Sequence, residues 1–277
     1  NVISGNQQNG ISVIGSTATG NRVQSSFIGT NAAGTAALAN AIDGVRLVDA
    51  PNNIIGGVSA GARNVISGNG SPAGGSGIAI FGSAATGNQI LGNFIGTDVT
   101  GTRPLANFFQ GVALNSPGNF VGGVFVESGN VISGNGQHGI ALFGPDAERN
   151  AVLSNLIGTD PTGTQPVGNF NSGIFIERGS NNAIGGFARG GQLRTRDVPR
   201  RVREPFGLLG GNVIAFNGRN PADAGILIAD GTGNTIHASN SIFSNAGLGI
   251  DLAATGVNAN DLGDGDSVQN FPVLASA

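Results

Sequence analysis

Apolar residues occur along this chain in runs of three to five, in which an apolar side chain alternates with a small or polar one. The stretches that follow Gly10, Gly77 and Gly139 are examples, and glycine and asparagine separate such runs throughout. Alternation with a period of two predicts short β-strands, whereas a helix needs a period near 3.6. The spacing between runs is too short for βαβ units. The pattern therefore predicts an all-β protein.

One hydrophobic string returns at long and nearly equal intervals. Asn-Val-Ile-Ser-Gly-Asn occupies Asn1–Asn6, Asn64–Asn69 and Asn130–Asn135, and Asn212–Asn217 carries a related string. Other strings follow in a constant order, such as Ile-Gly-Thr. A period of this kind indicates a solenoid in which each repeat buries its apolar face against its neighbours. The chain is thus a threefold repeat of a block of about 65 residues.

A finer period of roughly 22 residues links nine apolar positions within and between the blocks. We expect these nine to point inward in one parallel sheet: Ile3, Val23, Val45, Ile66, Ile90, Val112, Ile132, Val152 and Ile174. The period predicts a right-handed parallel β-helix (solenoid) of about twelve coils of roughly 22 residues, about 55 Å long at the usual strand spacing.

Asparagine recurs where the chain must bend. Asn tolerates left-handed backbone, and stacked Asn amides can hydrogen-bond from one coil to the next. We therefore interpret the repeated asparagines as structural ladders and predict no catalytic Asn.

Composition narrows the classes of partner. The formal net charge of −3 gives no broad basic field, so we expect no nucleic-acid partner. Apolar runs such as Gly77–Gly82 are too short to span a bilayer, so we predict no membrane span. Cysteine is absent, which excludes disulfides and thiolate metal sites. The chain starts inside a repeat, and we expect a longer parent chain with further domains.

One segment breaks the repeat. Phe187–Leu209 delays the fourth block and carries six of the thirteen basic residues, all of them arginine, together with Pro199 and Pro205. We predict one β-helix domain over residues 1–277, with Phe187–Leu209 as an Arg-rich loop insertion and residues 251–277 as an acidic C-terminal closing segment. The insertion could cover an edge, bind an acidic partner or be solvated.

The repeat strings resemble the right-handed parallel β-helix repeats of long bacterial secreted and cell-surface proteins, in the broad pectate-lyase-like group. The tail from Gly247 to Leu252 and the Asn260–Asp266 string are similar to the segment that closes such helices before immunoglobulin-like modules. The resemblance implies an extracellular or cell-surface protein. It implies no single activity, because the group contains polysaccharide lyases, hydrolases, adhesins and proteins without known activity.

Candidate catalytic residues are sparse. Asp98 and Asp160 occupy the repeat position of Asn31, so on the predicted coil they lie three coils apart, roughly 14 Å, too far for a hydrolase pair. His138 and His237 also occupy positions where the other blocks carry unrelated side chains. We assign no catalytic residue and no organic cofactor.

Calcium is the one cofactor that the sequence suggests. Asp261, Asp264 and Asp266 place three carboxylates close together in the sequence, among Gly and Asn, and oxygen is the ligand that calcium takes. The turns at Asp98 and Asp160 have one carboxylate each, which favours self-bonded turns.

These features predict a non-catalytic extracellular structural or surface-display module. The first coil would offer unpaired strands, which predicts end-to-end association with another copy as a filament, or pairing with more of a parent chain. The alternatives are a polysaccharide-acting enzyme (lyase or hydrolase), a glycan-binding adhesin, which the absence of Trp and Tyr disfavours, and an ice-binding protein.

Overall fold

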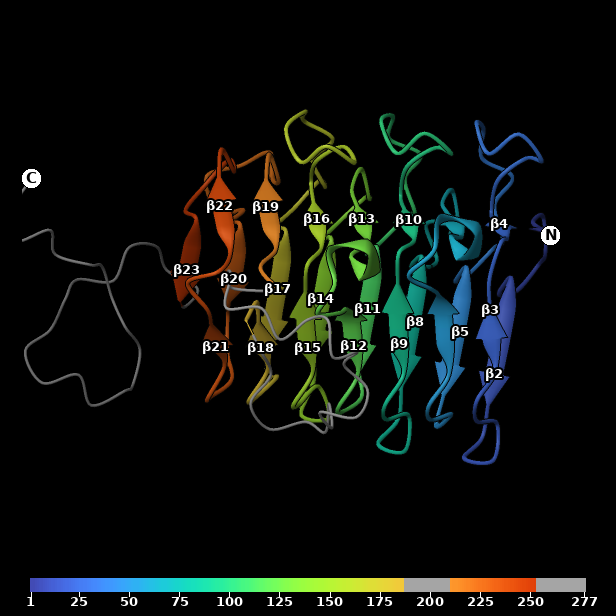
Figure 1. The fold of residues 1–277 in the computed structure, drawn as a ribbon, viewed down its shortest axis with the longest axis horizontal. Helices are drawn as coiled ribbons and strands as arrows, with labels where there is room; N and C mark the ends of the chain where they lie inside the picture. Colours follow the sequence, from blue (N-terminus) through green and yellow to red (C-terminus); the bar gives the residue numbers. More distant parts are fainter. Residues whose placement is uncertain (187–209, 253–277) are drawn as a thin grey trace, which may run out of the picture.

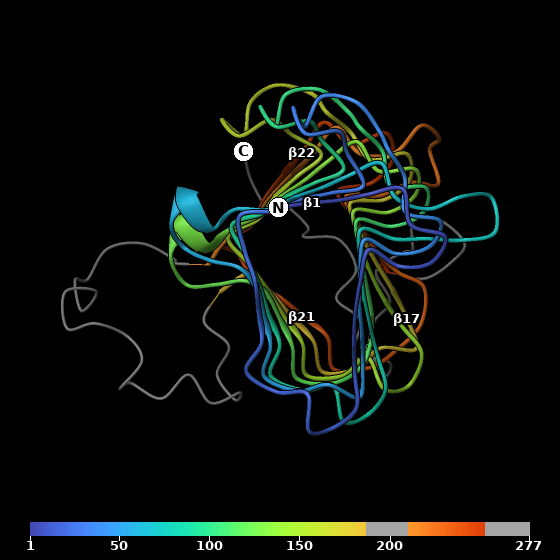
Figure 2. The same ribbon diagram turned by 90° about the vertical axis from the view of Figure 1, so that its right-hand side faces the viewer.

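The chain folds as a parallel β-helix whose coils stack along one axis (Figure 1). This computed structural model describes residues 1–186 and 210–252. Three sheets, here called A, B and C, contain only parallel strands, and each sheet takes one strand from a coil. Seen from the N-terminal end in Figure 2, the chain passes clockwise from A to B to C as it recedes, which makes the helix right-handed. The predicted fold class is confirmed.

The strands are short, and their order in each sheet follows the sequence. Sheet A contains β1 (Val2–Ile3), β4 (Phe27–Ile28), β7 (Val65–Ile66), β10 (Phe94–Ile95), β13 (Val131–Ile132), β16 (Leu156–Ile157), β19 (Val213–Ala215) and β22 (Ser241–Phe243). Sheet B contains β2 (Ile11–Ile14), β5 (Val45–Val48), β8 (Ile78–Phe81), β11 (Val112–Asn115), β14 (Ile140–Phe143), β17 (Ile174–Glu177), β20 (Ile226–Ile228) and β23 (Ile250–Leu252). Sheet C contains β3 (Arg22–Val23), β6 (Ile54–Gly56), β9 (Gln89–Leu91), β12 (Phe120–Gly122), β15 (Ala151–Leu153), β18 (Ala183–Ile184) and β21 (Thr235–Ile236).

The predicted number of coils is wrong. Sheets A and B each hold eight described strands, so the described rod has eight coils and spans about 34 Å at the usual strand spacing. Equivalent asparagines in successive coils are 29, 37, 25, 57 and 28 residues apart along one edge of sheet A. Each repeated block therefore contains two coils and six strands. The finer period corresponds to a step of two strands, or two thirds of a coil.

The same geometry corrects the predicted single sheet of core positions. All nine residues pack in the central core, but three belong to each sheet. Ile3, Ile66 and Ile132 lie in sheet A, Val45, Val112 and Ile174 in sheet B, and Val23, Ile90 and Val152 in sheet C. Every second strand along the chain belongs to sheets A, C and B in turn. The nine positions, which are two strands apart, are therefore spread over all three inner faces.

Like side chains stack on like in this core. Ile28 pairs in register with Ile66, and Ile66 with Ile95, and none of the three side chains is exposed. Branched side chains suit a pleated surface, and burying each one fully contributes roughly 1.5 to 3 kcal/mol. No layer needs a large aromatic anchor, which agrees with a chain that contains no Trp or Tyr.

Three ladders of asparagine, buried except at their ends, run along the edges of the rod, as predicted. In each link, the Asn of one coil donates through its backbone N–H, its side-chain Nδ2 or both to Oδ1 of the Asn in the next coil. Ladder 1 precedes sheet A and contains Asn64, Asn93, Asn130, Asn155, Asn212 and Asn240. Ladder 2 follows sheet A and contains Asn6, Asn40, Asn69, Asn107, Asn135, Asn169, Asn217 and Asn245. Ladder 3 precedes sheet C and contains Asn21, Asn53, Asn88, Asn119, Asn150, Asn182 and Asn234.

Ladder 2 also explains the glycine of the Ile-Gly-Thr string. Gly29 and Gly96 have φ of +86° and +87°, and a Cβ on either would overlap Oδ1 of a ladder asparagine in a neighbouring coil, Asn69 or Asn135. Any larger residue would therefore both strain the backbone and displace the ladder.

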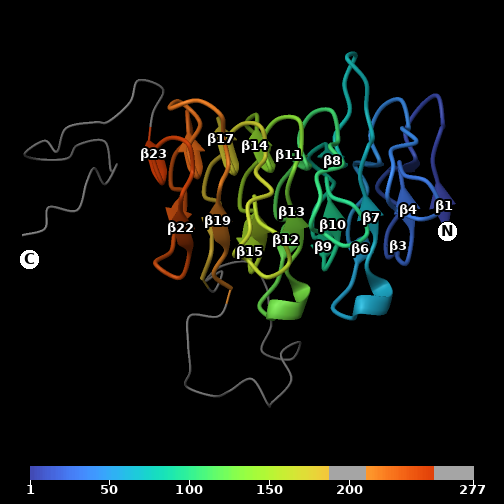
Figure 3. The same ribbon diagram turned by 90° about the horizontal axis from the view of Figure 1, so that it is seen from above.

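Loops cover parts of the outer surface. Hairpins at residues 30–37, 97–104 and 159–166 project from alternate coils and pack over the outer side chains of sheet A, which include Phe27, Phe94 and Leu156. Two short 3₁₀ turns, η1 (Ala60–Ala62) and η2 (Val126–Ser128), lie between sheets C and A (Figure 3). None of the described residues forms a helix long and apolar enough to cross a membrane.

The predicted insertion Phe187–Leu209 lies outside the described residues. The coils on both sides of it remain in register, because Leu156 of β16 pairs with Val213 of β19 and Asn155 bonds Asn212. Along the sequence, the insertion falls between β18 and β19, as η1 falls between β6 and β7 and η2 between β12 and β13.

Replacing Asn107 with Asp should destabilise the rod by about 3 kcal/mol or more. Asn107 Nδ2 donates to Ile66 O and to Asn135 Oδ1, so a carboxylate there would set acceptor against acceptor in a buried site. Denaturant unfolding measures the change.

The matched control is Asn31→Asp, because the equivalent loops already carry Asp98 and Asp160 at that position. This variant should unfold within about 0.5 kcal/mol of the parent protein. Equal stability of the Asn107 and Asn31 variants would show that the ladders do not hold the coils together.

Candidate functional site

The predicted calcium ligands Asp261, Asp264 and Asp266 lie outside the described residues. Within residues 1–186 and 210–252, no group of three or more His, Asp or Glu side chains is placed to hold a metal ion.

Asp98 and Asp160 hold their own loops together. Asp98 Oδ1 accepts hydrogen bonds from Thr100 N, Thr100 Oγ1 and Thr102 N, and Asp160 accepts from Thr162 Oγ1, Thr164 N and Gln165 N. The two loops are two coils apart rather than three, and Gly101 approaches Pro161. Their carboxylates thus form self-bonded turns, as the sequence favoured.

These bonds alter the pKa of Asp160. Burial acts to raise its pKa, but the hydrogen bonds from Gln165, Thr162 and Thr164 outweigh burial and hold the pKa below its usual value. A carboxylate of this kind is stabilised in its charged form and is a poor proton donor near neutral pH.

The two histidines lie on different sides of the rod. His237 follows β21 of sheet C, with its ring against Gly186. His138 precedes β14 of sheet B, and its ring stacks on Phe175 with centroids 4.6 Å apart and planes 9° apart. Burial lowers the pKa of His138 to about 4, so its ring is uncharged at neutral pH. Its Nδ1 is buried without a hydrogen-bond partner.

His138 lies in the wall of a groove of about 520 Å³ on the outer face of sheet B. Ala113 and Ala141 form the floor from the outward second position of β11 and β14, and Ala79 holds the equivalent position in β8. Their paired neighbours at the two ends are larger, Arg46 in β5 and Phe175 in β17. The groove therefore spans the central coils and is bounded at each end.

The two long walls of the groove differ in chemistry. Along one wall, Ser76 Oγ donates to Gln110 Oε1, and Gln110 Nε2 donates to Gln137 Oε1. The opposite wall is formed at the last strand position by Phe81, Phe143 and Glu177. A hairpin closed by the pairing of Ser71 with Gly74 rises beside the polar wall (Figure 3).

Sequence reasoning missed this groove. Its residues lie in different coils at positions that become neighbours only once the coil length is known, and the shorter coil predicted from the sequence did not align them. The available signal was the run of three alanines at one strand position, where other coils carry Ser12, Leu227 or Asp251.

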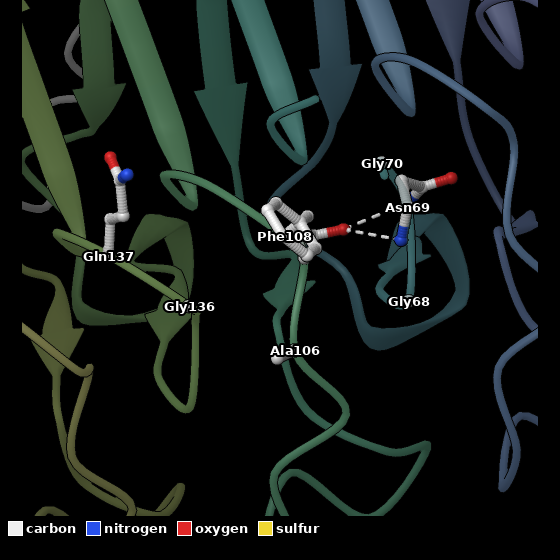
Figure 4. A pocket seen from close by; sticks show the side chains of 8 residues that line it. Gly68, Asn69, Gly70, Ala106, Phe108, Gly136 and Gln137 are labelled. Carbon is white, nitrogen blue, oxygen red and sulfur yellow. Dashed lines mark hydrogen bonds between the residues drawn. The ribbon is translucent and has the colours of Figure 1, made fainter. Parts of the chain in front are cut away.

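A shallower hollow of about 440 Å³ lies beside the groove, at the corner between sheets A and B. Phe108 stands exposed between Gly68–Gly70 on one side and Gly136 and Gln137 on the other (Figure 4). Ladder 2 forms its base through Asn69 and Asn107, whose polar groups are already bonded. The hollow offers a ring and little free hydrogen-bonding capacity.

Comparisons with known proteins leave the family open: no family model, no curated protein and no solved structure matches this chain.

Replacing Thr162 with Val should raise the pKa of Asp160 towards its usual value, because the Thr162 hydroxyl bonds both of its carboxylate oxygens. A lowered pKa stabilises the fold above the unfolded value near 4, and this stabilisation is lost as the pH falls through the folded pKa. The parent protein should therefore lose more stability on acidification than the variant. Carbon NMR titration of the Asp160 carboxyl measures the shift, with exposed Thr17→Val as control. An unchanged pKa in the Thr162 variant would contradict this account.

Proposed function

We propose that this chain is a non-catalytic, extracellular structural or surface-display module: a rigid rod that carries the groove of sheet B. The continuity of the three asparagine ladders carries the proposal. They join all the described coils through buried hydrogen bonds, so bending the rod would break bonds on one side of the helix.

The two aspartates that the sequence offered as a possible pair are engaged in the fold. Asp98 Oδ1 and both carboxylate oxygens of Asp160 accept hydrogen bonds from their own loops. His138, the histidine of the groove, is uncharged at neutral pH and stacked on Phe175. These contacts favour a structural module over the alternative of a polysaccharide-acting lyase or hydrolase.

The polarity of the ladders supports extension of the rod in one sense only. Every bond between ladder asparagines runs from a donor in one coil to Oδ1 in the following coil, while Nδ2 also donates backward to a carbonyl, as Asn107 does to Ile66 O. A further coil, from a parent chain or a second copy, can continue the ladders only if it is stacked head to tail. Head-to-tail stacking generates open filaments rather than closed dimers.

The natural absence of cysteine allows a direct test of rigidity, with spin labels on Thr17→Cys and Thr232→Cys. These exposed residues lie at the corner between sheets B and C, six coils apart. Pulsed electron paramagnetic resonance should therefore give one narrow distance distribution centred at about 29 Å. A broad distribution would contradict a rigid rod.

The parent protein should release no new reducing ends or unsaturated products when it is incubated with neutral or acidic polysaccharides. Sustained release by the parent protein would favour the polysaccharide-acting enzyme instead and overturn the proposed function.

A further inference from the structure

At one end of the groove, the protein binds one of its own cations. The Arg46 guanidinium lies over the ring of Phe81, 4.8 Å from the centroid, and its Nη1 donates to Asp43 Oδ2 at 3.0 Å. Arg46 is at the second position of β5, and Phe81 is at the fourth position of the next strand in the sheet, β8. A ring face and a carboxylate together hold a guanidinium here.

Farther along the same wall, a second ring and a carboxylate carry no cation from the described residues; this ring, Phe143, packs edge-to-face on Phe81 with centroids 6.1 Å apart. Phe143 holds the fourth position of β14, equivalent to Phe81, and it pairs in register with Glu177 of β17. The residue that corresponds to Arg46 is Ala113, at the second position of the preceding strand, β11. The volume that the Arg46 side chain fills beside Phe81 is thus open groove beside Phe143.

Glu177 has no counter-charge within the part of the chain that the structure describes. Among the described residues, its carboxylate makes neither a salt bridge nor a hydrogen bond, whereas Asp43 is paired with Arg46. His138 and Phe175 add a stacked pair of rings at the same end, and His138 is uncharged at neutral pH. An incoming cation would therefore meet an unpaired carboxylate and aromatic rings.

We propose that this end of the groove binds an arginine side chain of a partner peptide, with the guanidinium over Phe143 and against Glu177. Arginine is favoured over lysine because its planar group stacks on aromatic faces and pairs with carboxylates through two parallel hydrogen bonds. The alanine floor lets the peptide backbone approach the sheet. The Gln137 amide nitrogen, which makes no hydrogen bond within the described residues, is available to a peptide carbonyl.

The inference is independent of the proposed rod, since a flexible or enzymatic protein could carry the same site. Its test uses the full chain labelled with nitrogen-15 and two peptides, acetyl-Gly-Ser-Arg-Ser-Gly-amide and its citrulline counterpart, which keeps the shape and loses the charge. The arginine peptide should shift the amide signals of Phe143, Phe175 and Glu177 and bind at least tenfold more tightly than the citrulline peptide.

Two variants localise the binding. Glu177→Gln should weaken the arginine peptide about tenfold, or about 1.4 kcal/mol, whereas Glu127→Gln, on exposed η2, should leave it unchanged. Ala113→Arg should abolish binding, because the new side chain would occupy Phe143 as Arg46 occupies Phe81. It leaves Phe143 and Glu177 themselves unchanged, although Ala113 is part of the groove floor.

Three results would overturn the proposal. Equal binding of the two peptides would remove the role of charge. Neutral or acidic oligosaccharides that shift the same signals, with no response to the arginine peptide, would make the groove a glycan site. Binding that emerges only after Arg189, Arg194, Arg196, Arg200, Arg201 and Arg203 are all replaced by Gln would identify that segment of the chain, rather than a partner, as the occupant.

Discussion

The structure depends on the need to satisfy asparagine amides that are buried at the three edges of the central coils. An Asn in ladder 2, such as Asn107, accepts from the coil before it and donates to the coil after it and to a strand carbonyl. A buried amide left without these partners would cost roughly 1 to 3 kcal/mol. In the central coils, an Asn at the same edge of the next coil supplies these partners, so the ladders favour one register of the three sheets.

With the register fixed by the ladders and the apolar interior, the outward strand positions are free to differ. In sheet B, the inward positions hold Val45, Ile78 and Val112, while the outward positions change from Arg46 to alanine and then to Phe175. The groove lies where successive coils carry alanine at this outward position, between Arg46 and Phe175.

Much of this could be predicted from the sequence. The returning Asn-Val-Ile string and the Gly-bounded runs predicted the fold class, and the recurrent Asn predicted the ladders. The coil length could not be obtained from the spacing of apolar residues alone, because Val23 and Val45 are both inward although they lie in different sheets. Adding the asparagines would have resolved the coil length, since Asn64, Asn93 and Asn130 mark one edge and skip the intervening apolar positions.

The groove could not be predicted for a related reason. Ala113 and Phe143 are distant in the sequence and become diagonal neighbours only in the correct register. Nothing in the sequence singles out Glu177, and only its pairing in register with Phe143 places it beside that ring.

Hydrogen exchange of the asparagine side-chain amides tests the central claim most directly. Nitrogen-15 NMR can follow the Nδ2 protons of Asn93, Asn107 and Asn150, which are almost fully buried in ladders 1, 2 and 3, against those of Asn31 in an outer loop. If the ladders hold the coils together, the ladder amides exchange as slowly as the backbone amides of the central strands, because both open only when coils separate. Ladder amides that exchange as fast as Asn31 would show that the coils are held by the apolar core alone.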